Sequence, residues 1–333
     1  MSAPIVAVVG LRAHAASADG TQVMPVLHGV DLALEAGRCV AVVGESGGGK
    51  TTLARALLAL GRMRPGVTGG RFYADGKKIL DDYPEHDYPV VRHHDGFLLR
   101  HWQRLYEGRV GRLRGTALFP IAQDPRAALS PYLSVGRQVA DVVDRPRRER
   151  ADRAGELLAS LAFPRTAIDR YPHQLSTGMC QRVQLAMALA LGARGVVADE
   201  PTSKIDAIGR RAAAAQLRSL VESGRGLALF THALALAREL AHEVVVLYRG
   251  RVVERGPATS VLGPGEHHPY TARLIDAEHG AARPDASRVI PVEGGGCPYA
   301  PRCELAFARC REDPPAFAIG AGHTARCWRF ESA

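Results

Sequence analysis

The sequence predicts an α/β fold built on a parallel β-sheet with helices on both faces. Three short apolar runs, at residues 38–44, 195–198 and 227–230, end in glycine or polar residues and are separated by helical segments. Such unbroken apolar strands are typical of parallel sheets, which bind ligands at the carboxyl ends of their strands. We therefore expect the polar residues that follow these runs to converge on one site.

The length and texture of the chain indicate more than one unit. Its 333 residues, 46% hydrophobic and 23% charged, indicate a folded protein larger than one average domain. We expect a main domain over residues 1–265, interrupted at about 124–184 by a mostly helical subdomain. Residues 266–333 are punctuated by Gly and Pro with little periodicity, which predicts a small irregular, cysteine-rich C-terminal extension that needs an additional stabilising feature.

Charge and hydropathy limit the possible partners. No stretch reaches the roughly 18 apolar residues of a membrane helix, and the first ten residues lack a basic leader, so we expect a cytoplasmic chain. The net charge of +9 is compatible with nucleic acid, anionic lipid or a phosphorylated ligand. The Arg-rich run at 145–150 has no interleaved aromatic residues and is interpreted as a solvated helix surface, so no nucleic-acid partner is expected.

The first apolar run leads into a phosphate-binding motif. Residues 44–51 fit G-x-x-x-x-G-K-[ST] in full, with the strand before and the helix after that the motif requires. Its glycines let backbone N–H groups approach phosphate oxygens. Lys50 is expected to reach the β and γ phosphates and the Thr51 hydroxyl to bind Mg²⁺. The predicted ligand is ATP with Mg²⁺, bound by Gly44, Glu45, Ser46, Gly47, Gly48, Gly49, Lys50, Thr51 and Thr52.

Two adjacent acids, Asp199 and Glu200, follow the second apolar run. At a strand end, one carboxylate can hold the magnesium shell while its neighbour points toward the attacking water. Acid pairs are common on surfaces, so the prediction depends on the phosphate loop upstream. We predict Asp199 as a magnesium ligand and Glu200 as the general base.

Residues 171–183 resemble the signature of ABC ATPases. Ser176 and Gly178 open a helix whose amino terminus can bind a phosphate. The resemblance implies a head-to-tail pair of ATPase domains, with each nucleotide held between one subunit's phosphate loop and its partner's signature residues Ser176, Thr177 and Gly178. A second ATPase subunit is therefore an expected partner.

Other residues match further motifs of this family. Gln123 matches the Q-loop, which in the family contacts magnesium and water and touches the membrane subunit. His232 matches the switch histidine, which contacts the γ phosphate, and Asp206 matches the D-loop aspartate. The stretch where the family often has an adenine-stacking Tyr or Phe offers only His14. The resemblance implies that the catalytic residues are Glu200, His232, Lys50 and Gln123, and that the magnesium ligands are Thr51, Gln123 and Asp199.

The sequence departs from the family pattern at Thr177, Lys204-Ile205 and Ala233. A branched side chain at Thr177 would crowd the partner's γ phosphate, so we hypothesise that one site of an asymmetric pair is slow. Residues 76–115 are longer than the usual link before the Q-loop, and the sequence assigns them no role.

Three segments, at 123–131, 171–174 and 267–271, resemble the oligopeptide/dipeptide importer ATPases, a likeness that covers nearly the whole chain. It implies ATP-driven peptide uptake on the cytoplasmic face of the inner membrane, as a peripheral subunit. The implied partners are a paralogous ATPase, two membrane permease subunits and an extracytoplasmic solute-binding protein. Nickel or metallophore import remains an alternative with the same ATPase design, and a non-transport ABC ATPase is a rival from another class.

Four of the six cysteines, Cys297, Cys303, Cys310 and Cys327, lie in the last forty residues. In a cytoplasmic chain such a cluster suggests a metal before a disulfide, and four thiolates can hold zinc or an iron–sulfur cluster. The C-x-x-C spacing usual for structural zinc is absent, and the family resemblance implies a 4Fe–4S cluster in some members, so 4Fe–4S is favoured over zinc and over unligated thiols. Because these cysteines lie far from the phosphate loop in the sequence, we expect them to stabilise the extension without affecting nucleotide binding.

Overall fold

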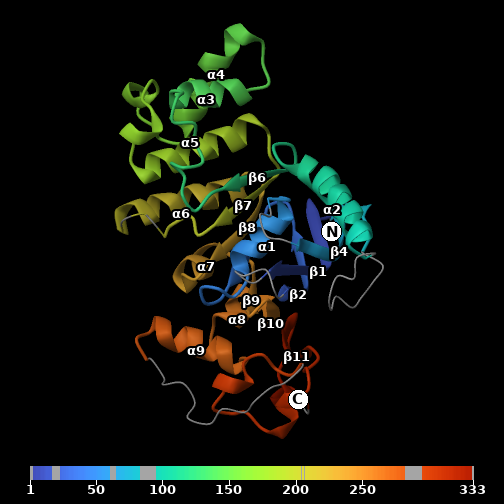
Figure 1. The fold of residues 1–333 in the computed structure, drawn as a ribbon. Coiled ribbons are helices and arrows are strands. Elements are labelled where there is room, and N and C mark those ends of the chain that lie inside the picture. The colour runs from blue at the N-terminus through green and yellow to red at the C-terminus, as the bar shows by residue number, and fades with distance from the viewer. Residues whose placement is uncertain are drawn as a thin grey trace.

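The computed structural model describes residues 3–16, 23–60, 65–82, 95–203, 205, 207–281 and 295–331. Figure 1 shows a helical region at one end, two sheets with their helices in the middle, and the C-terminal residues at the other end. No helix in the described ranges is long and apolar enough to cross a membrane.

The main sheet has eight strands in the order β11-β12-β10-β9-β3-β8-β7-β6, and the pairs that join β6, β7, β8, β3 and β9 are parallel. The three apolar runs of the sequence form neighbouring strands in this sheet, which confirms the predicted α/β fold. These parallel strands are β3 (Cys39–Val43), β6 (Leu118–Ile121), β7 (Gly195–Asp199), β8 (Gly226–Thr231) and β9 (Glu243–Tyr248), and β10 (Arg251–Pro257) pairs antiparallel with β9.

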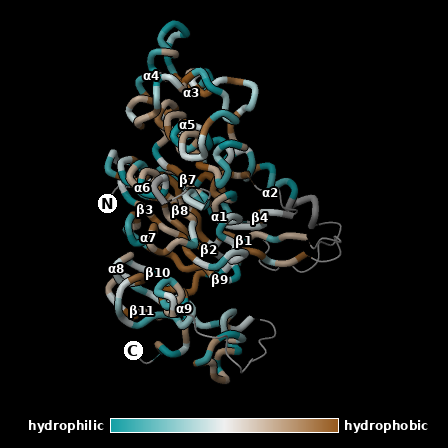
Figure 2. The backbone as a smooth tube through the Cα atoms, turned by 90° about the vertical axis from the view of Figure 1, so that its left-hand side faces the viewer, coloured by the Kyte–Doolittle hydropathy of each residue, from teal (hydrophilic) through white to brown (hydrophobic). Residues whose placement is uncertain are grey.

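Alternate residues of β3 enter two hydrophobic cores. Val40 and Val42 face the first core, shared with α1 (Lys50–Leu57) and the second sheet, whereas Ala41 and Val43 face the second core, shared with α6 (Ala207–Glu222) and α7 (Leu234–Leu240). One face of the main sheet is thus covered partly by strands, where the sequence predicted helices. Figure 2 shows hydrophobic residues along these central strands.

The second sheet is antiparallel, in the order β2-β1-β4-β5. Its strands are β1 (Val6–Ala16), β2 (Val23–Leu34), β4 (Pro65–Ala74) and β5 (Lys77–Leu80). The long segment 76–115 supplies β5, α2 (Asp95–Val110) and a 3₁₀ turn (Gly111–Leu113). Trp102 and Tyr106 are buried, and the Tyr106 hydroxyl donates to the Ala56 carbonyl at 2.7 Å. This segment therefore covers the antiparallel sheet beside α1.

A helical region lies between β6 and β7 (Figure 1). It comprises α3 (Val135–Val142), α4 (Arg150–Ser160) and α5 (Thr177–Ala190) around a core of its own. The Ser134 and Ser176 hydroxyls cap α3 and α5 by accepting the backbone N–H groups of Arg137 and Met179. Such serine caps satisfy otherwise unpaired N–H groups at a helix start.

The C-terminal part contains α8 (Ala258–Val261), α9 (Pro269–Glu278), β11 (Phe317–Gly320) and β12 (His323–Ala325). β12 pairs with β10 of the main sheet, so the extension continues the sheet of the main domain. The sequence analysis predicted no such hairpin.

One buried carboxylate, that of Glu254 in β10, attaches the extension. It accepts from His267 Nδ1 at 3.0 Å, from His323 Nε2 at 2.7 Å and from the His268 backbone N–H at 2.8 Å. Burial alone would raise the pKa of Glu254, but the hydrogen bonds from His267 and His323 help to lower it overall. The bond to Glu254 also raises the pKa of His267 against the opposing effect of burial. An ion pair shielded from water thus links α9 and β12 to the main sheet.

Candidate nucleotide-binding site

The phosphate loop joins β3 to α1, and its glycines are required by space and by backbone conformation. Gly44, Gly47 and Gly49 have φ values of 154°, 82° and 101°. A side chain at Gly44 would place its Cβ 2.2 Å from the Leu247 carbonyl oxygen. The close approach of the loop to β9 therefore excludes any larger residue at this position.

Lys50, the first residue of α1, is buried, and its ammonium group donates to the carbonyl oxygens of Gly44 at 2.7 Å and Glu45 at 3.0 Å. Burial lowers its pKa, while the nearby carboxylates of Glu200 and Asp199 act in the opposite direction. The side chain is a cation held inside the loop, in a position to bind phosphate oxygens.

Thr51 and Asp199 meet at the carboxyl end of β7. The Thr51 hydroxyl donates to Asp199 Oδ1 at 3.2 Å. Burial raises the pKa of Asp199, and the bond from Thr51 partly offsets this effect. A hydroxyl and a carboxylate at this separation are hard oxygen donors of the type that Mg²⁺ prefers, so the donor set fits the ion.

Glu200 occupies a strained backbone position, with φ of 49°. Such non-glycine residues in the left-handed region cost about 1–3 kcal/mol and cluster at functional sites. Its Oε1 accepts from the His232 backbone N–H at 3.0 Å and lies 2.8 Å from His232 Nδ1, and its Oε2 accepts from the Thr231 hydroxyl at 3.3 Å. The ends of β7 and β8 together fix the direction of this carboxylate.

A pocket of about 250 Å³ brings nine of the predicted site residues together. Val26 of β2 also lines it, although this residue belongs to no motif and no sequence pattern indicates it. The lining comprises Val26, Ser46, Gly47, Gly49, Lys50, Thr51, Thr52, Gln123, Glu200 and His232.

His14, the only ring in the stretch where the family often has an adenine-stacking Tyr or Phe, does not line this pocket. Its ring is buried within the antiparallel sheet, and His14 Nδ1 lies 2.7 Å from the Thr68 hydroxyl oxygen. Burial lowers the pKa of His14, with Arg12 adding to the effect. A ring enclosed in this way cannot offer a face to a base.

The signature residues Ser176, Thr177 and Gly178 do not line this pocket but begin α5. Ser176 is exposed, and a side chain at Gly178 would meet no atom within 4 Å. This placement leaves the helix start open to another molecule. Asp206 and Lys204 lie outside the described residues. Ala233, where the family often has Asp, donates its backbone N–H to the Thr231 hydroxyl at 3.0 Å.

The fold and the site define the class of ATP-binding cassette proteins. The family model described as "ABC transporter" matches residues 27–203, and the chain belongs to this family. It is 32% identical to a probable peptide ABC transporter ATP-binding protein, y4tR, of Sinorhizobium fredii, over 91% of this chain and 89% of that protein. It is 33% identical to the dipeptide transport ATP-binding protein DppD of Escherichia coli, over 90% and 89% respectively. The resemblance inferred from the motifs is confirmed.

Solved structures share the fold. The dimeric ATP-binding cassette MJ0796, bound to ADP and Pi, aligns with a TM-score of 0.60 and 23% identity over 76% of this chain and 98% of that one. The cbiO1 protein of Clostridium perfringens aligns with a TM-score of 0.57 and 23% identity over 78% and 90%. At this identity the likeness concerns the fold alone.

Proposed function

We propose that this chain is the ATP-hydrolysing subunit of an importer that moves dipeptides or oligopeptides across the cytoplasmic membrane. The observation that carries the proposal is the pocket in which Lys50, Glu200 and His232 meet, in a chain whose relatives are peptide and dipeptide transport ATP-binding proteins. Phosphoryl transfer to water needs a base, positive charge at the phosphates and a fixed geometry, and this pocket has residues for each.

In the proposed reaction, Glu200 accepts a proton from the attacking water, and His232 and Thr231 hold its carboxylate in place. Lys50 turns from the loop carbonyls to the β and γ phosphates. Thr51, Asp199 and Gln123 would hold Mg²⁺, which neutralises phosphate charge when it is bound. The start of α5 in a second ATPase chain, through residues equivalent to Ser176, Thr177 and Gly178, would close the site from the other side.

The proposed assembly contains a second ATPase, which we expect to be a paralogue, two membrane permease subunits and an extracytoplasmic solute-binding protein. The chain would lie peripherally on the cytoplasmic face of the inner membrane. Support comes from the peptide-importer names of the relatives and from the open start of α5. A nickel or metallophore importer is the second candidate.

We further propose a division of the chain into residues 1–265 and 266–333, with a four-cysteine cluster in the second part. Cys297, Cys303, Cys310 and Cys327 are all buried and free. Burial raises the pKa of Cys297 and Cys303 to about 11, while backbone hydrogen bonds act to lower it. Three sulfurs accept N–H groups from the residue two positions on, Tyr299 for Cys297, Leu305 for Cys303 and Arg329 for Cys327.

These hydrogen bonds suit sulfurs that carry negative charge as ligands. The four cysteines lack the C-x-x-C pairs usual in structural zinc sites, and some members of the family that the chain resembles hold a 4Fe–4S cluster, so we propose 4Fe–4S as the occupant with zinc as the alternative. Iron and sulfide analysis of anaerobically purified protein tests this point: four irons per chain would support the cluster, and stoichiometric zinc would refute it.

The cargo is tested with proteoliposomes that contain this chain, its partner ATPase and the permeases, with ATP inside. Uptake of a labelled dipeptide that requires both ATP and the solute-binding protein is the expected result. Uptake of nickel without peptide uptake would support the second candidate.

A further inference from the structure

Glu45, the second residue of the phosphate loop, contacts the C-terminal extension. Its backbone N–H donates to the Tyr270 hydroxyl oxygen at 2.7 Å, and its carboxylate accepts from the Arg302 guanidinium at 2.8 and 3.4 Å. Arg302 is 257 positions away in the chain and directly precedes Cys303. The cysteine segment, which is far from the phosphate loop in the sequence, therefore lies next to it in space.

Glu45 also organises the loop from within. Its carbonyl oxygen accepts from the Gly48 N–H at 3.2 Å and from the Lys50 ammonium at 3.0 Å. The N–H and carboxylate of this residue are thus held by the extension, and its carbonyl holds the lysine that faces the phosphates. Glu45 therefore joins the extension directly to the group that holds Lys50.

Tyr270 forms the first link between the cysteine segment and Glu45. It lies in the first turn of α9, is fully buried and packs against Tyr248 and Tyr299, with ring centroids 4.5 Å and 5.4 Å away. Burial raises the pKa of Tyr270, so its hydroxyl stays neutral. Tyr299 donates its backbone N–H to the sulfur of Cys297. Packed rings therefore connect Cys297 to the phosphate loop.

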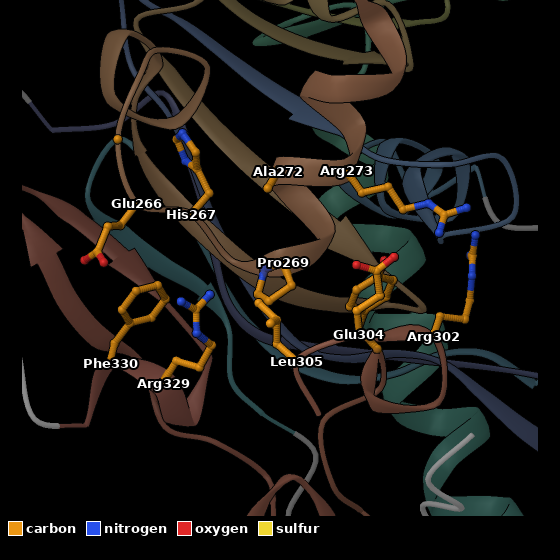
Figure 3. Close-up of a pocket in the computed structure, with 12 residues that line it drawn as sticks. Glu266, His267, Pro269, Ala272, Arg273, Arg302, Glu304, Leu305, Arg329 and Phe330 are labelled. Atoms are coloured by element: carbon orange, nitrogen blue, oxygen red, sulfur yellow. The ribbon is translucent and has the colours of Figure 1, made fainter. Parts of the chain in front are cut away.

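Arg302 forms the second link. The Arg302 N–H donates to the Tyr299 carbonyl at 2.9 Å, and the Cys303 N–H donates to the Ala300 carbonyl at 3.2 Å, so one short turn fixes both Arg302 and the cysteine. Figure 3 shows Arg302 beside Arg273 at one end of a pocket of about 290 Å³ between the start of α9 and residues 299–330. The side chains of Arg302 and Glu45 are 28% and 39% exposed, so water weakens this pair relative to the buried bond from Glu45 to Tyr270.

We propose that Tyr270 and Arg302 are positioning residues for nucleotide binding, through which the folded segment 297–303 sets the conformation of the phosphate loop. ATP affinity then depends on the integrity of the C-terminal extension. This inference goes beyond the proposed function and does not depend on the cargo or on the identity of the cysteine-bound group.

The test is equilibrium titration of the full-length chain with a fluorescent ATP analogue and Mg²⁺. Tyr270→Phe is expected to weaken binding about tenfold, because it leaves the Glu45 N–H without its partner. Arg302→Gln is expected to weaken it about threefold, and Arg302→Lys to restore most of this loss. Arg326→Gln is the matched control, since Arg326 pairs with Asp313 at 2.9 Å within the extension and does not contact the loop. It is expected to bind like wild type.

Two further measurements separate positioning from general damage to the fold. The double variant Glu45→Gln/Arg302→Gln should lose no more nucleotide affinity than either single variant, because both changes remove the same contact. If segment 297–303 favours nucleotide binding, bound nucleotide must in turn stabilise that segment. Nucleotide should therefore slow amide exchange across residues 297–303 in the wild type, and the slowing should be smaller in Tyr270→Phe. If Tyr270→Phe does not fold, the Arg302 variants decide the question.

Wild-type affinity in both Tyr270→Phe and Arg302→Gln, or fully additive losses for Glu45 and Arg302, would overturn the inference and leave the proposed ATPase function intact. Failure of the wild-type chain to bind the analogue would overturn both.

Discussion

The phosphate site and the C-terminal extension are held together by different kinds of contact. In the phosphate site, neighbouring parallel strands and a tight loop place Lys50, Asp199 and Glu200 at one sheet edge. The extension, by contrast, is attached through the buried carboxylate of Glu254 in β10, and its own buried residues include free thiols. The phosphate site is therefore defined by main-chain geometry that a local motif encodes. The attachment of the extension depends on a few side-chain contacts between distant parts of the chain, so single substitutions and changes in pH should affect it more.

The largest expected effect is on the chemistry of the phosphate site. Glu200→Gln keeps the shape of the side chain but removes the base, so turnover should fall by about 10²–10⁴-fold while nucleotide still binds. Steady-state ATP hydrolysis and nucleotide titration measure the two quantities. Glu222→Gln, an exposed change at the end of α6, is the matched control. Near-normal turnover in Glu200→Gln would exclude this residue as the base.

The corresponding change in the extension should affect stability. Glu254→Gln leaves the buried His267 without its carboxylate partner, and breaking such a pair costs about 3–5 kcal/mol. Denaturant unfolding gives the total loss, and hydrogen exchange should locate it in residues 295–331.

Glu278→Gln is the control for that measurement. Glu278 pairs with Arg238 at the surface, at 2.9 Å, and this change should cost less than about 1 kcal/mol. Equal losses in the two variants would show that Glu254 does not attach the extension.

The same contacts predict a pH dependence confined to the extension. Because the pKa of His267 is raised in the folded state, protonated His267 stabilises the fold. This contribution is complete at pH values below 6.5, the pKa in the unfolded chain, and is lost as the pH rises through the folded pKa. The lowered pKa of Glu254 stabilises the fold above 4.5, and this contribution is lost as the pH falls through its folded pKa. The attachment should therefore be most stable between pH 4.5 and 6.5, with slopes of at most about 1.4 kcal/mol per pH unit outside that window. Amide protection factors at residues 317–325, which correct exchange rates for their intrinsic pH dependence, would reveal this window, and protection factors that do not change with pH would contradict it.

The smallest expected effect concerns Thr177 at the start of α5. If its branched side chain crowds the partner's γ phosphate, Thr177→Gly should raise turnover of the assembled transporter, by about twofold to fivefold. Hydrolysis by the complex is the measurement, with Thr166→Gly, in a 3₁₀ turn of the same helical region, as a control. An unchanged rate for Thr177→Gly would remove the crowding hypothesis.

Local patterns were sufficient to predict the central strands β3, β7 and β8 and most of the residues that line the pocket, because Gly44, Lys50 and Glu200 each belong to a strand-end motif whose geometry is fixed by the backbone. Val26 was missed because it approaches the phosphate loop from another sheet. The burial of the His14 ring beside Thr68 could not be predicted from its position in the sequence. The contact between Arg302 and Glu45 joins two charged side chains far apart in the chain, and no periodicity encodes such a pair.

The most direct test of the central claim is ATP hydrolysis by the complete transporter, with and without a peptide-loaded solute-binding protein. The account predicts hydrolysis that peptide stimulates and that Glu200→Gln abolishes. Two results would contradict the account. One is a rate of hydrolysis that is the same with and without peptide. The other is hydrolysis that persists in Glu200→Gln complexes whose second ATPase site is also disabled.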